Sequence, residues 1–124
     1  MLMGMPPENC AMVGRCGPSL VIESDGSVYP CDFYALDAWK LGSISDDSLR
    51  RMLTGEREQA FLAESLPIPS ACRACRWYSL CRNGCKRERV PETGLNRWCG
   101  VHASFFEYAY PRMREMAEAL QITD

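Results

Sequence analysis

Cysteine is the residue type in this sequence that most clearly suggests chemistry, because eight cysteines occur and several are closely spaced. A step such as Cys72-x2-Cys75 lets two thiolates reach one metal centre from a tight turn, and the cysteines that follow can wrap the same centre. Thiolate is the soft ligand that zinc and iron–sulfur clusters prefer. The sequence therefore predicts two metal sites with four thiolates each. The eight candidate ligands are Cys10, Cys16, Cys31, Cys72, Cys75, Cys81, Cys85 and Cys99.

The spacing alone leaves the metal open, since four cysteines can hold a structural zinc ion or a [4Fe–4S] cluster. His102 is the single histidine, so zinc sites of mixed Cys/His type are nearly excluded. Zinc ribbons and fingers tend to show paired C-x2-4-C steps, whereas one such step is embedded here in the run from Cys72 to Cys85. That pattern favours a cluster-binding run. In two-cluster ferredoxins the last cysteine of a run serves the other cluster, and the same crossing is possible here.

Length and composition favour a small domain held together by metal. The chain has 124 residues, which is one domain at most, and its net charge of −2 gives no basic field for nucleic acid. No stretch approaches the roughly 20 apolar residues of a membrane span, and the N-terminus lacks the features of a signal peptide. We therefore expect a cytoplasmic protein with reduced thiols and no membrane partner. A secreted disulfide scaffold and a redox disulfide switch are the alternatives.

A β-hairpin is predicted over residues 20–29, where two β-rich runs flank Asp25-Gly26, a pair suited to a type I′ turn. Pro30 has no N–H and should end the second strand, so that the hairpin presents Cys31 at a defined place. Side chains alternate along an extended segment. We therefore expect Asp32, the next residue, to point away from the metal.

Several short helices are expected around the hairpin. Residues 45–48 are typical of a helix start, and Gly55 should end that helix. A second short helix is expected over 56–64, and an amphipathic helix over 102–120 that Pro111 kinks or splits. Trp77, Tyr78 and Trp98 are expected to form a hydrophobic shell over the metal sites. The predicted fold class is α+β, small and loop-rich, with one β-hairpin and several short helices organised around two four-cysteine metal sites.

The motifs resemble the SPASM domain, the C-terminal auxiliary-cluster domain of certain radical S-adenosylmethionine enzymes. That domain is marked by an early cysteine, then G-x4-C, then C-x2-C-x5-C-x3-C and a last cysteine. The sequence fits this pattern with Cys16, the Gly26-x4-Cys31 step, the run from Cys72 to Cys85, and Cys99. Cys10 is an additional early cysteine. The resemblance covers nearly the whole chain, so we expect residues 1–124 to form a single domain.

Among SPASM enzymes the chain is most similar to the anaerobic sulfatase-maturating enzymes. This similarity is found in residues 23–34, in residues 39–42 and in the early pair Cys10/Cys16. Those enzymes oxidise a serine or cysteine of a sulfatase to formylglycine. The resemblance implies two [4Fe–4S] clusters. Cluster one would be held by Cys10, Cys16, Cys31 and Cys85, and cluster two by Cys72, Cys75, Cys81 and Cys99.

One family motif is absent. The N-terminal barrel of these enzymes has C-x3-C-x2-C, which binds the cluster that cleaves S-adenosylmethionine, and no such motif occurs here. The chain is therefore expected to be a fragment that lacks the radical barrel and is inactive alone. Its expected partners are that barrel, a sulfatase or other peptide substrate, and an external electron acceptor.

Asp32 corresponds to the proposed general base of the sulfatase maturases, which implies that it deprotonates the substrate in the intact enzyme. Judged without the family, a turn-capping aspartate is the simpler interpretation. The leading functional hypothesis is an auxiliary cluster domain that relays electrons away from the substrate and shapes its pocket. The alternative is a structural zinc-binding or protein-interaction module with two four-cysteine sites, and with zinc as the metal.

Overall fold

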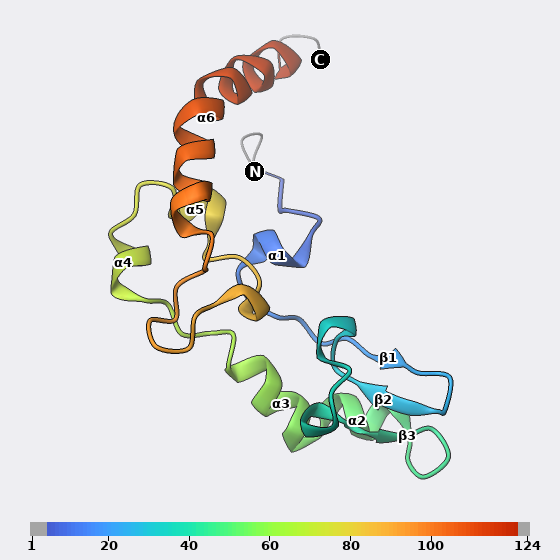
Figure 1. Ribbon diagram of the computed structural model, residues 1–124. Helices are drawn as coiled ribbons and strands as arrows, with labels where there is room; N and C mark the ends of the chain where they lie inside the picture. The colour runs from blue at the N-terminus through green and yellow to red at the C-terminus, as the bar shows by residue number, and fades with distance from the viewer. Residues whose placement is uncertain (1–4, 122–124) are drawn as a thin grey trace. The chain divides into compact units, whose positions relative to one another are not determined.

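The computed structural model describes residues 5–121 of the chain, and Figure 1 shows its helices and strands. The chain divides into two compact units. Unit 1 combines Met1–Gly14 with Ile68–Asp124, and unit 2 is Arg15–Pro67. Unit 2 contains a small antiparallel sheet, and helices occur in both units, so the predicted α+β class is confirmed.

The sheet of unit 2 has three antiparallel strands in the order β1-β2-β3. The strands are β1 (Val21–Ile22), β2 (Ser27–Tyr29) and β3 (Gly42–Ser43). β1 and β2 are the predicted hairpin, with Val21 opposite Tyr29, and β2 ends just before Pro30 as expected. β3 was not predicted, because it has two residues of low β-propensity and its pairing depends on β2 rather than on its own sequence.

The hairpin turn differs from the predicted type I′ turn. A type I′ turn needs positive φ at both central residues. Here Gly26 has φ +84, whereas Asp25 is not among the described residues with positive φ. The Gly26 N–H donates to the Glu23 carbonyl at 2.9 Å, which makes a four-residue turn whose last residue is a left-handed glycine. The Asp25 carboxylate favours this turn because it accepts from the Ser27 N–H and hydroxyl, both at 2.9 Å.

Four short helices complete unit 2. Two are single 3-10 turns, η1 (Asp32–Tyr34) and η2 (Asp37–Trp39), and two are α-helices, α2 (Leu49–Thr54) and α3 (Glu56–Ala63). The Ser48 hydroxyl caps α2 by accepting from the Arg51 N–H at 3.3 Å, which confirms the predicted helix start. Phe61 of α3 is 1% exposed and meets Tyr34 and Trp39 edge-on, with ring centroids 5.0 and 5.2 Å apart. Phe61 belongs to the buried core of unit 2 with Val28, Tyr29 and Met52, and the half-buried rings of Tyr34 and Trp39 cover it.

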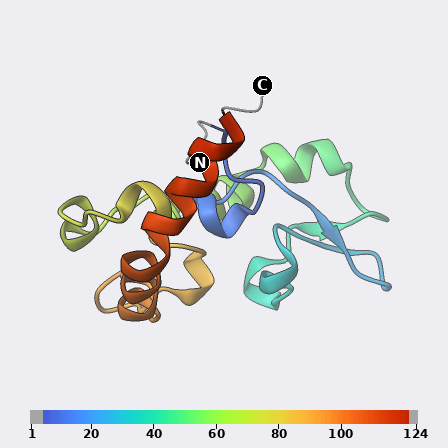
Figure 2. The same ribbon diagram turned by 90° about the horizontal axis from the view of Figure 1, so that it is seen from above.

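Unit 1 consists of helices and connecting loops. Its helices are α1 (Cys10–Val13), α4 (Ser70–Arg73), α5 (Tyr78–Cys81), η3 (Lys86–Glu88) and α6 (Cys99–Gln121). α6 begins three residues earlier than predicted and runs through Pro111 without a break, although Figure 1 shows its direction changing in its second half. Figures 1 and 2 both show α1 beside α6.

The core of unit 1 is built from Trp77, Leu80 and Phe106. The rings of Trp77 and Phe106 have centroids 6.0 Å apart, and Cys75 and Cys81 pack against this core. Trp77 is therefore buried beside Cys75 and Cys81, whereas Trp98 is 53% exposed. The core fixes α5 against α6, and these helices carry Cys81 and Cys99.

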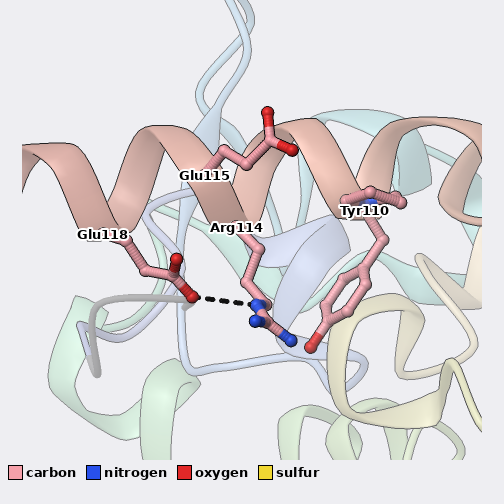
Figure 3. A pocket seen from close by; sticks show the side chains of 5 residues that line it. Tyr110, Arg114, Glu115 and Glu118 are labelled. Carbon is pink, nitrogen blue, oxygen red and sulfur yellow. Dashed lines mark hydrogen bonds and ion pairs between the residues drawn. The ribbon is translucent and has the colours of Figure 1, made fainter.

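The second half of α6 is polar on one side. Figure 3 shows a shallow hollow there, where Arg114 and the Tyr110 ring point toward the same space and Glu115 points away. Arg114 Nε donates to Glu118 Oε1 at 2.9 Å, one helical turn further on. This hollow contains no cysteine. No helix within residues 5–121 combines the length and apolar character needed to cross a membrane.

Candidate metal centre

Four cysteines of unit 1 lie in or next to three of its helices, α4, α5 and α6. Cys72 lies in α4 and is buried, Cys75 follows α4, Cys81 is the last residue of α5, and Cys99 is the first residue of α6. The C-x2-C step is a tight turn, as predicted, because the Cys75 N–H donates to the Cys72 carbonyl at 3.1 Å.

Electrostatic interactions connect Cys72 and Cys81 with the other cysteines of this set. Burial raises the pKa of Cys72, and the negative charges of Cys99, Cys81 and Cys75 raise it further. Burial also raises the pKa of Cys81, with smaller contributions of the same sign from Cys99 and Cys75. Like charges disfavour one another's ionisation only over short distances in a protein. These effects favour the protonated thiols, and a bound metal must displace the protons.

An all-cysteine set of this kind fits an iron–sulfur cluster in its donor chemistry. A [4Fe–4S] cluster is typically held by four cysteine thiolates. The eight cysteines all lie within residues 5–121, and none of them forms a disulfide. Among residues 5–121, no three His, Cys, Asp or Glu side chains are arranged as a site for a metal ion.

The other four cysteines are shared equally by the two units. Cys10 and Cys85 belong to unit 1, whereas Cys16 and Cys31 belong to unit 2. Cys10 opens α1, whose first turn is capped by Asn9 Oδ1 accepting from the Ala11 N–H at 2.9 Å. In unit 2 the Cys16 N–H donates to Ser65 Oγ at 2.9 Å, and Cys31 follows β2 as the hairpin argument predicted.

Within unit 1 the segment that carries Cys10 packs closely on the loop before Cys85. Gly14 has φ +76, and a Cβ at this position would fall on the Arg82 carbonyl and lie 2.6 Å from Arg82 Cβ. Arg89 ties the same segments together, because one guanidinium nitrogen donates to the Gly14 carbonyl at 2.7 Å and to the Gly84 carbonyl at 3.1 Å. The structure therefore holds the Cys10 and Cys85 segments side by side.

Asp32 does not point away from the Cys31 side chain, so that expectation is wrong. The chain turns into η1 at Asp32 instead of remaining extended, and Asp32 Oδ1 lies 3.2 Å from the Cys31 sulfur. The same oxygen accepts from the Phe33 N–H at 3.0 Å, which is a local turn contact of the capping type. The carboxylate is exposed beside Cys31.

An apolar cavity of about 530 Å³ in unit 1 was not foreseen from the sequence. Its wall includes Cys81, Cys85 and His102. His102 Nδ1 lies 3.6 Å from the Cys81 sulfur, so the single histidine of the chain contacts a candidate ligand. The i to i+3 spacing of Cys99 and His102 was the available signal, because it places both on one side of α6. The apolar part of the lining includes Leu80, Trp98, Phe105, Phe106 and Met113.

Comparison with protein families gives one match over more than half of the chain. The SPASM family, described as an iron–sulfur cluster-binding domain, matches residues 10–76. This range includes five of the eight cysteines, from Cys10 to Cys75.

Individual relatives match almost the whole chain. A cysteine-type anaerobic sulfatase-maturating enzyme of Clostridium novyi is 40% identical over 97% of the chain. A serine-type anaerobic sulfatase-maturating enzyme of Bacteroides thetaiotaomicron is 32% identical over 95% of it. The chain spans only 33% and 30% of these two proteins.

Solved structures match at the level of the fold. The structure described as native anSMEcpe with bound AdoMet is 39% identical and superposes with a TM-score of 0.84 over 91% of this chain and 32% of that one. A second structure of the same protein contains AdoMet and the Cp18Cys peptide, with the same TM-score of 0.84.

Proposed function

The chain belongs to the SPASM family of iron–sulfur cluster-binding domains, and from this premise we propose that it holds two auxiliary [4Fe–4S] clusters in a peptide-modifying enzyme. The observation that supports this most is the group of Cys72, Cys75, Cys81 and Cys99 within one compact unit, close enough for their charges to act on one another. When bound, the clusters would supply a relay for electrons leaving the substrate.

In this proposal the ligands cross between chain segments. Cluster two is held by the four cysteines just named. Cluster one takes Cys10, Cys16, Cys31 and Cys85, so that residues 1–124 act as a single auxiliary domain. The close packing of the Cys10 segment on the loop before Cys85, through Gly14 and Arg89, supports their assignment to one cluster.

The larger enzyme would supply what this chain does not contain. Its relatives are sulfatase-maturating enzymes, and the chain covers about a third of their length. We propose that an N-terminal radical barrel binds S-adenosylmethionine and a third cluster, and that a sulfatase serine or cysteine is the residue oxidised to formylglycine. An external acceptor would receive the electrons.

Asp32 is the proposed general base in that enzyme. Its carboxylate is exposed, lies beside Cys31, and can take a proton from a serine hydroxyl or a cysteine thiol as the neighbouring carbon is oxidised. Its contact with the Phe33 N–H holds one oxygen in place. The second oxygen is then the one that reaches the substrate.

The test is Asp32→Asn in the intact enzyme, with Asp37→Asn as a matched control. Both aspartates are exposed and begin 3-10 turns, but only Asp32 adjoins a cysteine. We expect Asp32→Asn to keep its iron and its peptide binding and to lose most formylglycine formation, because the amide preserves size but cannot accept the proton. Asp37→Asn should retain activity. Loss of cluster one in Asp32→Asn would show a structural role instead, and unchanged turnover would show no role.

A further inference from the structure

His102 contacts Cys81, a proposed ligand of cluster two, but His102 itself has no role in the proposed function. His102 Nδ1 lies 3.6 Å from the Cys81 sulfur, within hydrogen-bonding range for sulfur, although the two residues are 21 positions apart. His102 lies in the first turn of α6, and Leu80 and Phe106 of the core hold α5 and α6 together. The contact is therefore set by the packing of unit 1 rather than by local sequence.

Metal binding decides which atom of this pair donates. Without metal, the Cys81 thiol can donate its proton to the ring. A ligating cysteine is a thiolate, which has no proton and only accepts. The contact then persists only if the proton is on Nδ1, which leaves Nε2 without one in the neutral ring.

The surroundings make such a hydrogen bond effective. The apolar cavity beside the contact is lined by Leu80, Trp98, Phe105, Phe106 and Met113, and His102 is itself half-buried. Trp98 and Phe105 are partly exposed, but Leu80 and Phe106 are buried and displace water from one side of the contact. A hydrogen bond is electrostatically stronger where water is partly excluded than in bulk water. Hydrogen bonds to the cluster sulfurs are one of the factors that set the reduction potential.

Resting on the proposed function, we propose that His102 is a positioning residue that donates a hydrogen bond from Nδ1–H to the Cys81 thiolate and raises the reduction potential of cluster two. The donated hydrogen bond offsets part of the negative charge that the cluster gains on reduction. It therefore stabilises the reduced form more than the oxidised form. Cluster two then becomes the better acceptor of an electron.

Two variants separate the hydrogen bond from the shape of the ring. His102→Phe keeps a planar ring in the cavity wall and removes the donor. His102→Asn places an amide N–H near the position of Nδ1 and can restore it. Both are measured in the full chain, loaded anaerobically with iron and sulfide, by potentiometric titration monitored by electron paramagnetic resonance at one fixed pH.

We expect the midpoint potential of one cluster to shift downward in His102→Phe and to return toward the wild-type value in His102→Asn. The other cluster serves as the internal control and should not shift. Unchanged potentials in His102→Phe with both clusters present would overturn the inference, and so would an equal downward shift in both variants.

A measurement on the wild type covers the case in which His102→Phe does not bind iron. Electron–nuclear double resonance of the reduced protein should detect a proton coupled to cluster two that exchanges in D2O. The absence of any such exchangeable proton would overturn the inference. A wild-type chain that acquires no [4Fe–4S] cluster at all would instead refute the proposed function, so the two failures are distinguishable.

Discussion

Gly14→Ala should disrupt cluster one, because Gly14 is where the Cys10 segment meets the loop before Cys85. Its φ of +76 lies in the left-handed region, which costs an L-residue about 1–2 kcal/mol. The added Cβ would lie 2.6 Å from Arg82 Cβ and would also fall on the Arg82 carbonyl, which is backbone and cannot rotate away. Overpacking of this kind costs roughly 1–3 kcal/mol.

Together these terms give about 2–5 kcal/mol, which is a large part of the roughly 5–15 kcal/mol that stabilises a typical domain. The chain can relieve the clash by moving the Cys10 segment away from the Cys85 loop. Such a movement separates two of the proposed ligands of cluster one. We therefore expect Gly14→Ala to lose roughly half of the bound iron and to unfold at lower denaturant concentration.

Gly17→Ala is the matched control. Gly17 is also near Cys16 in sequence, but a Cβ at this position meets nothing within 4 Å and its φ is not in the left-handed region. The assay is iron and acid-labile sulfide per chain after anaerobic loading, followed by guanidinium unfolding. If Gly14→Ala keeps all its iron and unfolds at the same guanidinium concentration as Gly17→Ala, the proposed packing of the Cys10 segment on the Cys85 loop is wrong.

Three further predictions concern the ligands, the metal and the hairpin. Cys85→Ser should weaken cluster one, and Cys99→Ser should weaken cluster two. The separate electron paramagnetic resonance signals of the two clusters would show this. The reverse pattern would mean that Cys85 and Cys99 are assigned to the wrong clusters. Removing metal by chelation should abolish amide-exchange protection over residues 72–85, because ligand binding supplies much of the stability there, and full protection in the metal-free chain would contradict this. The Asp25 carboxylate accepts two hydrogen bonds from Ser27, and these lower the pKa of Asp25 in the folded chain. The ionised carboxylate therefore stabilises the hairpin above the pKa of Asp25 in the unfolded chain. This stabilisation is lost as the pH falls through the lower pKa of the folded chain. Nuclear magnetic resonance titration of Asp25 would test this, and an ordinary or raised pKa would contradict it.

Much of the local structure could be predicted because it depends on short-range chemistry. The Ser48 cap, the end of β2 before Pro30 and the tight turn at Cys72 follow from residues next to one another. The turn type could not be predicted from Asp25-Gly26 alone, because the hydrogen bonds from Ser27 to the Asp25 side chain select another turn. The sequence pattern thus predicted the existence of the hairpin but not its geometry.

Features that depend on distant residues were missed. Strand alternation predicted that the Asp32 side chain points away from the metal, but the chain turns into η1 at this residue. The contact of His102 with Cys81 joins residues 21 positions apart, so the spacing of Cys99 and His102 could indicate a histidine near the cysteines but could not identify Cys81 as its partner. The eight candidate ligands could be identified from spacing, since their number and close steps are unusual, whereas their division into two clusters rested on the family resemblance.

Metal content after anaerobic preparation will show whether the eight cysteines hold two four-iron clusters. We expect about eight iron atoms and about eight acid-labile sulfides per chain, the brown absorption of [4Fe–4S] clusters, and no zinc. A colourless protein with about two zinc ions per chain and no sulfide would contradict this expectation, and would support the alternative of a structural zinc module.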